Sequence, residues 1–239
     1  MQDILILKKG AEQLGFPMQD EEAQFFLRYR DMIEERNKSI NLTAITDREE
    51  VLIKHFLDSL SIMPLLDSIQ PKTIIDVGTG AGFPGIPIKI MRRHIEITLL
   101  DSLRKRIDFL GDVIKELCFE KITTVHARAE DAGINTLYRE KFDVAVSRAV
   151  AQMSVLAEYT LPLVKPGGSL IAYKSVESRQ EIELSEKAIK ILGGEIAEYR
   201  EVSLPYSDII HVIVLIKKKT ATPSQYPRKA GKLAKNPIK

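Results

Sequence analysis

A glycine-rich loop, DVGTGAGFPGIP at residues 76–87, has the residue types and the spacing to bind a charged small ligand. Gly78, Gly80 and Gly82 form a GxGxG pattern, and the last two of these form GxGxxG together with Gly85. Because glycine has no side chain, such a loop lets the backbone come close to a ligand. GxGxxG alone is a weak sign of dinucleotide binding, so the identity of the ligand depends on the flanking residues.

Three ligands suit a glycine loop between a strand and a helix, and the residues after Gly82 separate them. A nucleoside triphosphate requires Lys followed by Ser or Thr, whereas Ile86 and Pro87 occupy those positions. A dinucleotide is disfavoured, because Pro84 and Pro87 remove amide donors from the helix start that would hold its pyrophosphate. S-adenosylmethionine needs few amides and a close backbone approach, and it is the ligand that we expect.

Acidic residues at the ends of the first three predicted strands fit the polar groups of this ligand. Asp76 can receive its ammonium group, and Asp101, in LLDS, can accept hydrogen bonds from both ribose hydroxyls. After the third strand, ARAED places Ala129 and Glu130 where the adenine ring would lie. The alternative for Glu130 is a charge that only stabilises a helix N-terminus.

Short apolar and β-branched runs, separated by amphipathic segments, begin at Pro71 and must position these side chains. The alternation predicts an α/β fold with a mostly parallel sheet and helices on both faces. One helix is expected over 103–118. The last strand has no helix before it and should run antiparallel after the turn at 205–208. We expect strands at 73–77, 95–100, 122–126, 142–147, 169–174, 195–202 and 209–217.

The first 70 residues show helical spacing instead. Apolar residues recur at this spacing after Asp20 and again after Asp47, where Glu50 completes a start like a capping box. The sequence therefore divides into a helical extension at 1–70, an α/β domain at 71–217 and a basic tail at 218–239.

Composition indicates a reducing compartment and no membrane or metal site. A chain of 239 residues, 44% of them hydrophobic, can build a core of normal size. Cys118 is the single cysteine, so no intrachain disulfide can form, and no Cys/His cluster has the spacing of metal ligands. No apolar run suits a signal sequence or a membrane span. We expect a cytoplasmic, metal-free monomer.

The charge is unevenly distributed along the chain. Residues 217–239 carry eight Lys or Arg and no acid, so residues 1–216 sum to −6 within an overall net charge of +2. A basic tail on an acidic body suggests a polyanionic partner. The alternative is a solvated, disordered tail.

Five motifs together resemble those of class I (Rossmann-like) S-adenosylmethionine-dependent methyltransferases: DVGTGAGFPGIP, LLDSLRKR, ARAED, FDVAVSRAV and LVKPGG. They specifically resemble the bacterial small-subunit ribosomal RNA guanine-N7 methyltransferase family, also called glucose-inhibited division protein B. NLTAITDREE, HFLDSL and PRKAGKLAKNP extend the likeness to nearly the whole chain. The resemblance implies a seven-stranded sheet and methyl transfer to N7 of a guanine in 16S ribosomal RNA. It also implies cofactor contacts at Gly78, Phe83, Ala129, Glu130 and Arg148.

Two other kinds of base methylation depend on residues that the sequence does not supply. Methylation of pyrimidine C5 requires a cysteine nucleophile, but Cys118 lies in the apolar stripe of the helix expected at 103–118, where core packing is the expected role. Exocyclic amines commonly require an Asn/Asp-Pro-Pro-aromatic turn, whereas SRAV follows the fourth strand. Guanine N7 has an exposed lone pair and no proton to lose, so it needs alignment and no general base. Acidic oxygens and aromatic ring nitrogens have similar freedom. We assign no catalytic residue and take Arg148 as a candidate for positioning.

Cations at the ends of four strands are expected to form a basic rim around the cofactor. Arg106, Arg128, Arg148 and Lys174 follow or end the second to fifth strands, whose carboxyl ends share one edge of a parallel sheet. Such a rim would guide a phosphate backbone, although each cation alone could be a solvated residue. The target guanine should be unpaired or flipped out, because side chains cannot read the narrow major groove of A-form RNA. The predicted RNA contacts are Arg106, Arg128, Lys174, Arg228 and Lys229.

Two other functions remain open, and an NAD-dependent oxidoreductase ranks below both. One is methylation of a small molecule, which would make activity insensitive to salt and to loss of the tail. The other is a non-catalytic RNA-binding module on the same fold. His55 and Asp58 are expected to form a buried pair, and the sequence does not decide the role of Asn41.

Overall fold

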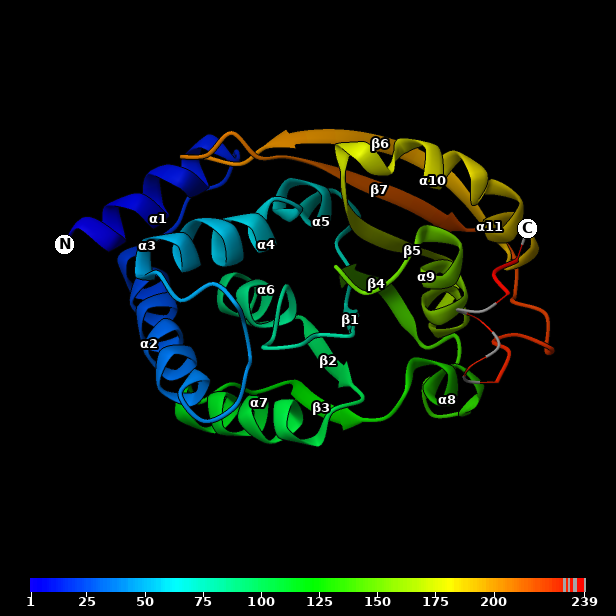
Figure 1. Cartoon of the computed structure of the whole chain (residues 1–239), viewed down its shortest axis with the longest axis horizontal. Helices are drawn as coiled ribbons and strands as arrows, with labels where there is room; N and C mark the ends of the chain where they lie inside the picture. Colours follow the sequence, from blue (N-terminus) through cyan, green and yellow to red (C-terminus); the bar gives the residue numbers. More distant parts are fainter. Residues whose placement is uncertain (230, 232, 234–235, 239) are drawn as a thin grey trace.

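Seven strands form one sheet at the centre of the molecule (Figure 1). The computed structural model describes residues 1–229, 231, 233 and 236–238. The strand order is β3-β2-β1-β4-β5-β7-β6; β1 to β5 are parallel, and β7 is antiparallel to both of its neighbours. The mostly parallel, seven-stranded sheet and the antiparallel last strand are therefore confirmed. The strands are β1 (Thr73–Val77), β2 (Glu96–Asp101), β3 (Ile122–His126), β4 (Phe142–Arg148), β5 (Val164–Ser175), β6 (Gly194–Ser203) and β7 (Ile210–Lys218).

Alternate residues of the central strands point into two cores, one on each face of the sheet. In β1, Ile74 belongs to one core and Ile75 to the other, and Val144 and Ala145 of β4 divide in the same way. The first core includes α1 (Gln2–Gln13), α2 (Asp20–Asn37), the π-helix η1 (Val51–Leu57), α4 (Asp58–Leu60), α5 (Met63–Ile69), α6 (Gly85–Met91) and α7 (Arg104–Glu116). The second includes α8 (Ala129–Ile134), α9 (Met153–Thr160), η2 (Leu161–Leu163), α10 (Arg179–Leu184) and α11 (Glu186–Ile191), and the short turn η3 (Val176–Ser178) follows β5.

The N-terminal helices share their core with the sheet. Phe26, Tyr29 and Phe56 are fully buried in the same cluster as Ile74. Asp47 begins the helical segment predicted after it, because its side chain accepts hydrogen bonds from two backbone amides at the start of α3 (Arg48–Glu50). The next seven residues form η1, a π-helical stretch of the kind that is frequent at functional sites.

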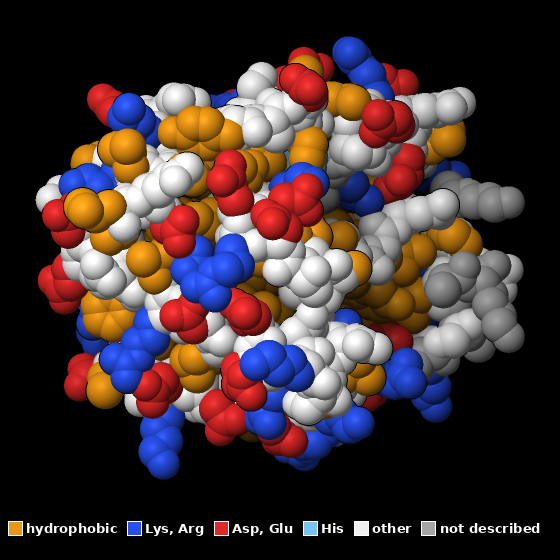
Figure 2. All heavy atoms as spheres, turned by 60° about the vertical axis from the view of Figure 1, so that its left-hand side comes forward, with side chains coloured by type: hydrophobic (Ala, Val, Ile, Leu, Met, Phe, Trp, Pro, Cys, Tyr) orange, Lys and Arg blue, Asp and Glu red, His pale blue; other side chains and the backbone are white. Residues whose placement is uncertain are grey.

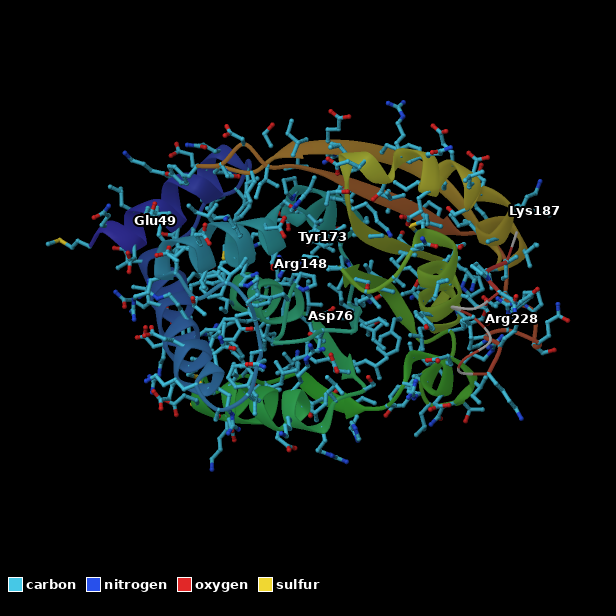
Figure 3. The ribbon with its side chains drawn as sticks, in the orientation of Figure 1. Glu49, Asp76, Arg148, Tyr173, Lys187 and Arg228 are labelled. Carbon is cyan, nitrogen blue, oxygen red and sulfur yellow. The ribbon has the colours of Figure 1, made fainter. Side chains whose placement is uncertain are left out.

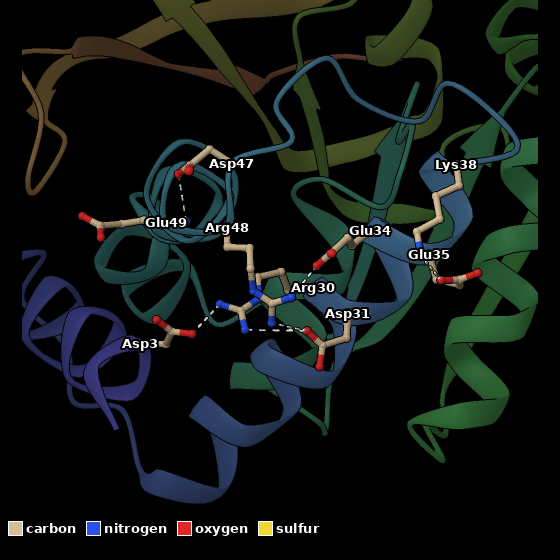
Figure 4. Close-up of polar contacts among 9 residues, drawn as sticks. All are labelled: Asp3, Arg30, Asp31, Glu34, Glu35, Lys38, Asp47, Arg48 and Glu49. Carbon is tan, nitrogen blue, oxygen red and sulfur yellow. Dashed lines mark hydrogen bonds and ion pairs between the residues drawn. The ribbon is translucent and has the colours of Figure 1, made fainter.

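A network of ion pairs joins α1, α2 and α3 (Figure 4). Arg30 of α2, whose side chain is buried, contacts Asp3 of α1 at 2.6 Å and Asp31 at 3.6 Å. Arg48 of α3 contacts the same Asp31 at 2.7 Å and Glu34 at 2.5 Å. The segment that connects α2 to η1 ends with α3, and these ion pairs hold α3 against α2.

The helix expected over 103–118 ends earlier, and the prediction for Cys118 was wrong. Cys118 lies beyond the last turn of α7, has a φ of 51° and is exposed. Its amide donates to the Lys115 carbonyl at 3.2 Å, and that of Phe119 to the Ile114 carbonyl at 3.0 Å, so the chain reverses through a left-handed residue. This reversal turns the thiol to solvent, while Phe119 takes up the buried position.

Much of the described part of the C-terminal tail is packed rather than solvated. Thr222, Pro227 and Leu233 are buried, and the segment runs back beside α8, α9 and α11 (Figure 1). Lys232, Lys235 and Lys239, which contribute to the predicted basic tail, lie outside the described residues.

Candidate functional site

A cleft of about 400 Å³ opens at the carboxyl ends of β1, β2 and β3. It lies where the strand order reverses between β1 and β4, the place where ligands of open α/β sheets bind. The parallel register brings together Gly78 and Glu130, 52 positions apart in the sequence, because the ends of these strands share one edge. Six predicted site residues line the cleft: Gly78, Asp101, Arg106, Arg128, Ala129 and Glu130.

Asp76 lies inside the glycine loop and does not line the cleft. Its Oδ2 accepts hydrogen bonds from the Thr79 hydroxyl at 2.6 Å and from the Gly85 amide at 2.8 Å. Its Oδ1 is buried and has no hydrogen-bond partner within the described part of the chain. Burial raises the pKa of this carboxyl to about 7, against the hydrogen bonds that lower it. Asp76 therefore shapes the loop and keeps one oxygen for a further donor.

Asp101 connects the loop to the second strand. Its Oδ2 accepts from the Gly80 amide at 2.9 Å and from Arg106 Nη1 at 3.2 Å, and its Oδ1 accepts from the Leu103 amide at 2.9 Å. The bond from Arg106 is the longest of the three. A ligand hydroxyl could replace Arg106 at this carboxylate without disturbing the loop.

Gly78 lies against the SRAV turn on the opposite side of the cleft. Its φ is 71°, and a Cβ atom at this position would come within 2.5 Å of a methyl group of Val150. Ala149, next to Val150, also has a positive φ, of 56°. A side chain at Gly78 would therefore push this turn away, which explains the glycine at this position.

The second half of the loop is packed into the N-terminal helices. The Tyr29 hydroxyl of α2 donates to the Ala81 carbonyl, and a Cβ on Gly82 would lie 2.6 Å from the same hydroxyl oxygen. Phe83 is 6% exposed, and its ring stacks on His55 with 4.5 Å between ring centroids. Gly82 and the Phe83 ring thus face the core, whereas Gly78 faces the cleft.

Arg148, at the end of β4, is held by a carboxylate from the N-terminal helices. Its Nη1 donates to Asp58 Oδ2 at 2.5 Å, and Nδ1 of His211 on β7 donates to the other oxygen of Asp58. Burial acts to raise the pKa of Asp58, but the hydrogen bond from His211 and the charge of Arg148 outweigh it and lower the pKa. Figure 3 shows Arg148 and Asp76 near the centre of the molecule.

His55 bonds to Arg148 and Thr43 rather than to Asp58, so the predicted pair is absent from the hydrogen bonds of the described residues. His55 lies in η1 and Asp58 is the first residue of α4, and both side chains contact the guanidinium of Arg148 instead of each other. Arg148 Nη2 lies 3.2 Å from His55 Nδ1, and a guanidinium can only donate. The proton of His55 is therefore on Nε2, which donates to Thr43 Oγ1 at 2.7 Å. Burial, together with Arg148, lowers the pKa of His55 to about 4, so it is neutral at pH 7.

Two cations predicted to contact RNA point elsewhere. Lys174 Nζ donates to the Ala151 carbonyl and to Glu181, both at 2.7 Å, and its side chain is 9% exposed. Arg228 pairs with the buried Glu158 and lies with the tail, away from the centre (Figure 3). Acceptors on other elements hold both side chains, and sequence spacing could not place those acceptors. The expected rim retains Arg106 and Arg128 at the cleft.

The face formed by the N-terminal helices has mixed charge. Figure 2 shows acidic and basic side chains interspersed across it. Part of this pattern is explained by cross-helix pairs such as Arg36 with Asp112, at 2.6 Å. Asn41 is exposed in the loop before α3, whose backbone Asn37 holds through Leu42 and Thr43. Asn41 is not among the described residues that line the cleft.

Comparison with known proteins places the whole chain in one family. The profile of the family described as GidB, rRNA small subunit methyltransferase G, matches residues 22–210. A protein of Alkaliphilus metalliredigens named ribosomal RNA small subunit methyltransferase G is 49% identical over 239 residues, which covers all of both chains. One of the same name from Alkaliphilus oremlandii is 53% identical over 234 residues, 98% of each chain. The chain belongs to the ribosomal RNA small subunit methyltransferase G family. The resemblance seen in the motifs is thereby confirmed.

Solved structures similar to this family member agree on the fold. TYW2 of M. jannaschii in complex with AdoMet gives a TM-score of 0.50 at 13% identity, over 65% of this chain and 75% of that chain. TrmN of Thermus thermophilus gives 0.51 at 13% identity, over 67% and 48%. At such low identity the likeness shows the fold alone, and the Rossmann-like methyltransferase fold is confirmed.

Neither a membrane span nor a metal cluster is found in the described part of the chain. None of its helices combines the length and apolar character needed to cross a bilayer. No three His, Cys, Asp or Glu residues are grouped there so that they could hold a metal ion.

The structure adds two residues to the site that sequence reasoning missed. Tyr159 of α9 lines the cleft, and burial, aided by nearby Glu130, raises the pKa of its hydroxyl. No sequence motif includes Tyr159, because the direction of its side chain depends on how α9 packs against the sheet. His211 reaches Asp58 because the antiparallel register pairs it with Ser175 at the end of β5. Only the register of β7 could have indicated that contact.

Proposed function

We propose that this protein transfers the methyl group of S-adenosylmethionine to N7 of a guanine in 16S ribosomal RNA, in the cytoplasm. One observation carries the proposal: Gly78, Asp101, Ala129 and Glu130 converge on one cleft at the reversal point of the sheet. They do so in a chain that aligns over its full length with relatives named ribosomal RNA small subunit methyltransferase G.

The residues around the cleft fit S-adenosylmethionine. The bare backbone at Gly78 would admit the ligand, and the unpartnered Oδ1 of Asp76 would accept from its ammonium group. Asp101 would exchange its long bond to Arg106 for a ribose hydroxyl. Ala129 and Glu130 would flank the adenine, with Tyr159 on the same wall. Phe83 and Gly82 would act indirectly, by fixing the loop.

The chemistry requires alignment rather than proton transfer. S-adenosylmethionine supplies an electrophilic methyl group on a sulfonium. The N7 lone pair forms the new bond to carbon as the carbon–sulfur bond breaks, and that electron pair stays on sulfur. No proton leaves N7, so no base is needed. His55 fits this scheme, because its Nδ1 already accepts from Arg148 and its single proton, on Nε2, is donated to Thr43. Arg148, fixed by Asp58, is the group that would position the base.

RNA would approach across the rim of the cleft. Arg128 is exposed and Arg106 partly so, and both line the cleft opening. Lys229 is exposed on the tail and stays a candidate, whereas Lys174 and Arg228 are held by internal partners. The target guanine must be unpaired or flipped, since N7 of a paired guanine lies in a groove that side chains cannot enter.

The proposal is tested by nucleoside analysis of methylated RNA. Purified protein with labelled S-adenosylmethionine and small-subunit RNA or particles should yield 7-methylguanosine. Asp101→Ala should abolish this product and weaken cofactor binding about 100-fold, because it removes a charged acceptor from the ligand and from the loop. Asp108→Asn, an exposed carboxylate on α7, is the matched control and should behave as wild type.

Three outcomes would contradict the proposal. Methylated adenine or cytosine would refute the assigned atom. Cofactor binding without RNA methylation would favour a small-molecule substrate. Absence of cofactor binding would favour a non-catalytic RNA-binding module. Light scattering of the same sample tests whether the protein is a monomer.

A further inference from the structure

Residues 218–228, here called the C-terminal strap, lie against the elements that form one wall of the cleft. The strap begins at Lys218, whose buried Nζ donates to the Leu161 carbonyl of η2 at 2.6 Å and to the Thr222 hydroxyl. The Thr222 amide then donates to Glu140 at 2.7 Å, and its hydroxyl to the Leu192 carbonyl at 2.9 Å. These contacts are internal and give the strap a defined path.

Arg139, which follows α8, fixes the middle of the strap. Its guanidinium donates to the carbonyls of Thr222 at 2.7 Å and Tyr226 at 2.8 Å. The same group donates to the Gly133 carbonyl of α8 at 2.8 Å. Arg139 therefore joins the backbone of the strap to the end of α8.

Arg228 closes the strap onto α9. Its backbone amide and Nε donate to Glu158 Oε1 at 2.8 and 2.9 Å, and its Nη2 donates to Oε2 at 2.6 Å. The side chain of Glu158 is 1% exposed, and the remaining Nη1 donates to the Asn236 carbonyl at 2.9 Å. A buried carboxylate without this partner would be strongly unfavourable. The guanidinium of Arg228 is thus committed to the protein.

In α8 and α9, residues that contact the strap lie next to residues that line the cleft. On α9, Glu158 accepts hydrogen bonds from Arg228 of the strap, and the next residue, Tyr159, lines the cleft. On α8, Glu130 lines the cleft, while one turn later a Cβ on Gly133 would lie 2.8 Å from Pro227 of the strap. A shift of either helix away from the strap would therefore move a cleft residue.

We propose that Glu158 and Arg228 are positioning residues for the cofactor: the strap holds α8 and α9 so that Glu130 and Tyr159 keep their places in the cleft. The inference rests on the proposed placement of S-adenosylmethionine in this cleft. It assigns Arg228 to cofactor affinity rather than to RNA contact. Because coupling between two sites is reciprocal, the cofactor should in turn stabilise the strap.

A pair of adjacent cations gives the matched test. Arg228→Gln should raise the Kd for S-adenosylmethionine, measured by calorimetry, at least fivefold and leave the KM for RNA and its salt dependence unchanged. Lys229→Gln removes the same charge from an exposed neighbour and should leave the cofactor Kd unchanged. Arg228→Lys keeps the charge but loses the two-pronged contact, so it should restore part of the affinity. Equal cofactor Kd values for wild type and Arg228→Gln would overturn the proposal, as would an effect confined to RNA.

Hydrogen exchange of the wild-type protein tests the reciprocal effect without a variant. Saturating S-adenosylhomocysteine, which lacks the methyl group, should slow exchange several-fold in the peptide covering 219–228. The loop at 76–87 should slow as well, because it would contact the ligand directly. Protection of the loop without the strap would refute the coupling and leave the proposed function intact. Protection of neither segment would refute the proposed cofactor site itself.

Discussion

The two walls of the cleft are held by different parts of the chain. The wall formed by the glycine loop is fixed from inside the core, by Tyr29 of α2 and by the Asp58–Arg148 pair. The wall formed by α8 and α9 is fixed from its outer side by the C-terminal strap, through Arg228. Contacts of the first wall are nearly all buried, whereas the side chain of Arg228 is 28% exposed. We infer that damage to the first wall lowers global stability, and damage to the second lowers cofactor affinity.

The largest expected effect is at Asp58. Asp58→Ala leaves the charge of Arg148 buried without its partner and removes the acceptor of His211. Removing one member of a buried ion pair costs about 3–5 kcal/mol, so the free energy of unfolding in urea should fall by that amount. Glu158→Gln, on the other wall, should lose less, because its partner is closer to solvent. Equal losses would remove the distinction between the walls.

The pH dependence of stability should show the burial of His55. Between pH 6.5 and about pH 4 the unfolded chain takes up a proton on His55 that the folded protein does not, so stability falls as pH falls. The shift corresponds to about 3 kcal/mol. Asp76 acts in the opposite direction, because its pKa is raised to about 7 and its contribution is lost as pH rises. Subtracting the profile of His55→Gln from that of wild type isolates the histidine; a flat difference would contradict the neutral assignment.

Cofactor binding should release a proton from Asp76. Near pH 7 about half of this carboxyl is protonated, and an ammonium group at Oδ1 would favour the ionised form. Affinity for S-adenosylmethionine should therefore rise up to about tenfold from pH 6 to pH 8. Calorimetry in buffers of different ionisation enthalpy counts the proton. Asp76→Asn should remove this dependence, and a pH-independent wild type would place the ammonium group elsewhere.

The smallest effect is expected at the rim. Arg128→Gln should reduce the slope of log affinity for RNA against log salt by about one, because one phosphate contact is lost. Arg228→Gln should leave this slope unchanged. If Arg228→Gln changed the slope as much as Arg128→Gln, the strap would have to be regarded as part of the RNA surface.

The sheet and the loop could be predicted from the sequence because both follow local rules. Apolar runs alternate with helices, and the spacing of Gly78 and the position of Asp101 at a strand end follow from the chain itself. The strands were correct to within a few residues, except for β5, which begins at Val164 rather than at 169.

Side-chain direction could not be predicted, because it depends on partners that are distant in sequence. Lys174 lies one residue before the end of β5, close to its expected place, but its Nζ donates to Glu181 of α10. Arg228 is met by Glu158, 70 residues earlier, and Asp58 by His211, 153 residues later. Nothing in the spacing of charges distinguishes these residues from Arg128, which stays exposed.

The contact of Tyr29 with the glycine loop has a consequence for protein engineering. A hybrid that keeps the sheet and takes its first 70 residues from an unrelated methyltransferase would lose the hydroxyl that fixes the Ala81 carbonyl. Such a hybrid should be less stable, and the second half of its ligand loop would no longer be held in place by a side chain of α2. Any minimal version of this enzyme must therefore retain α2.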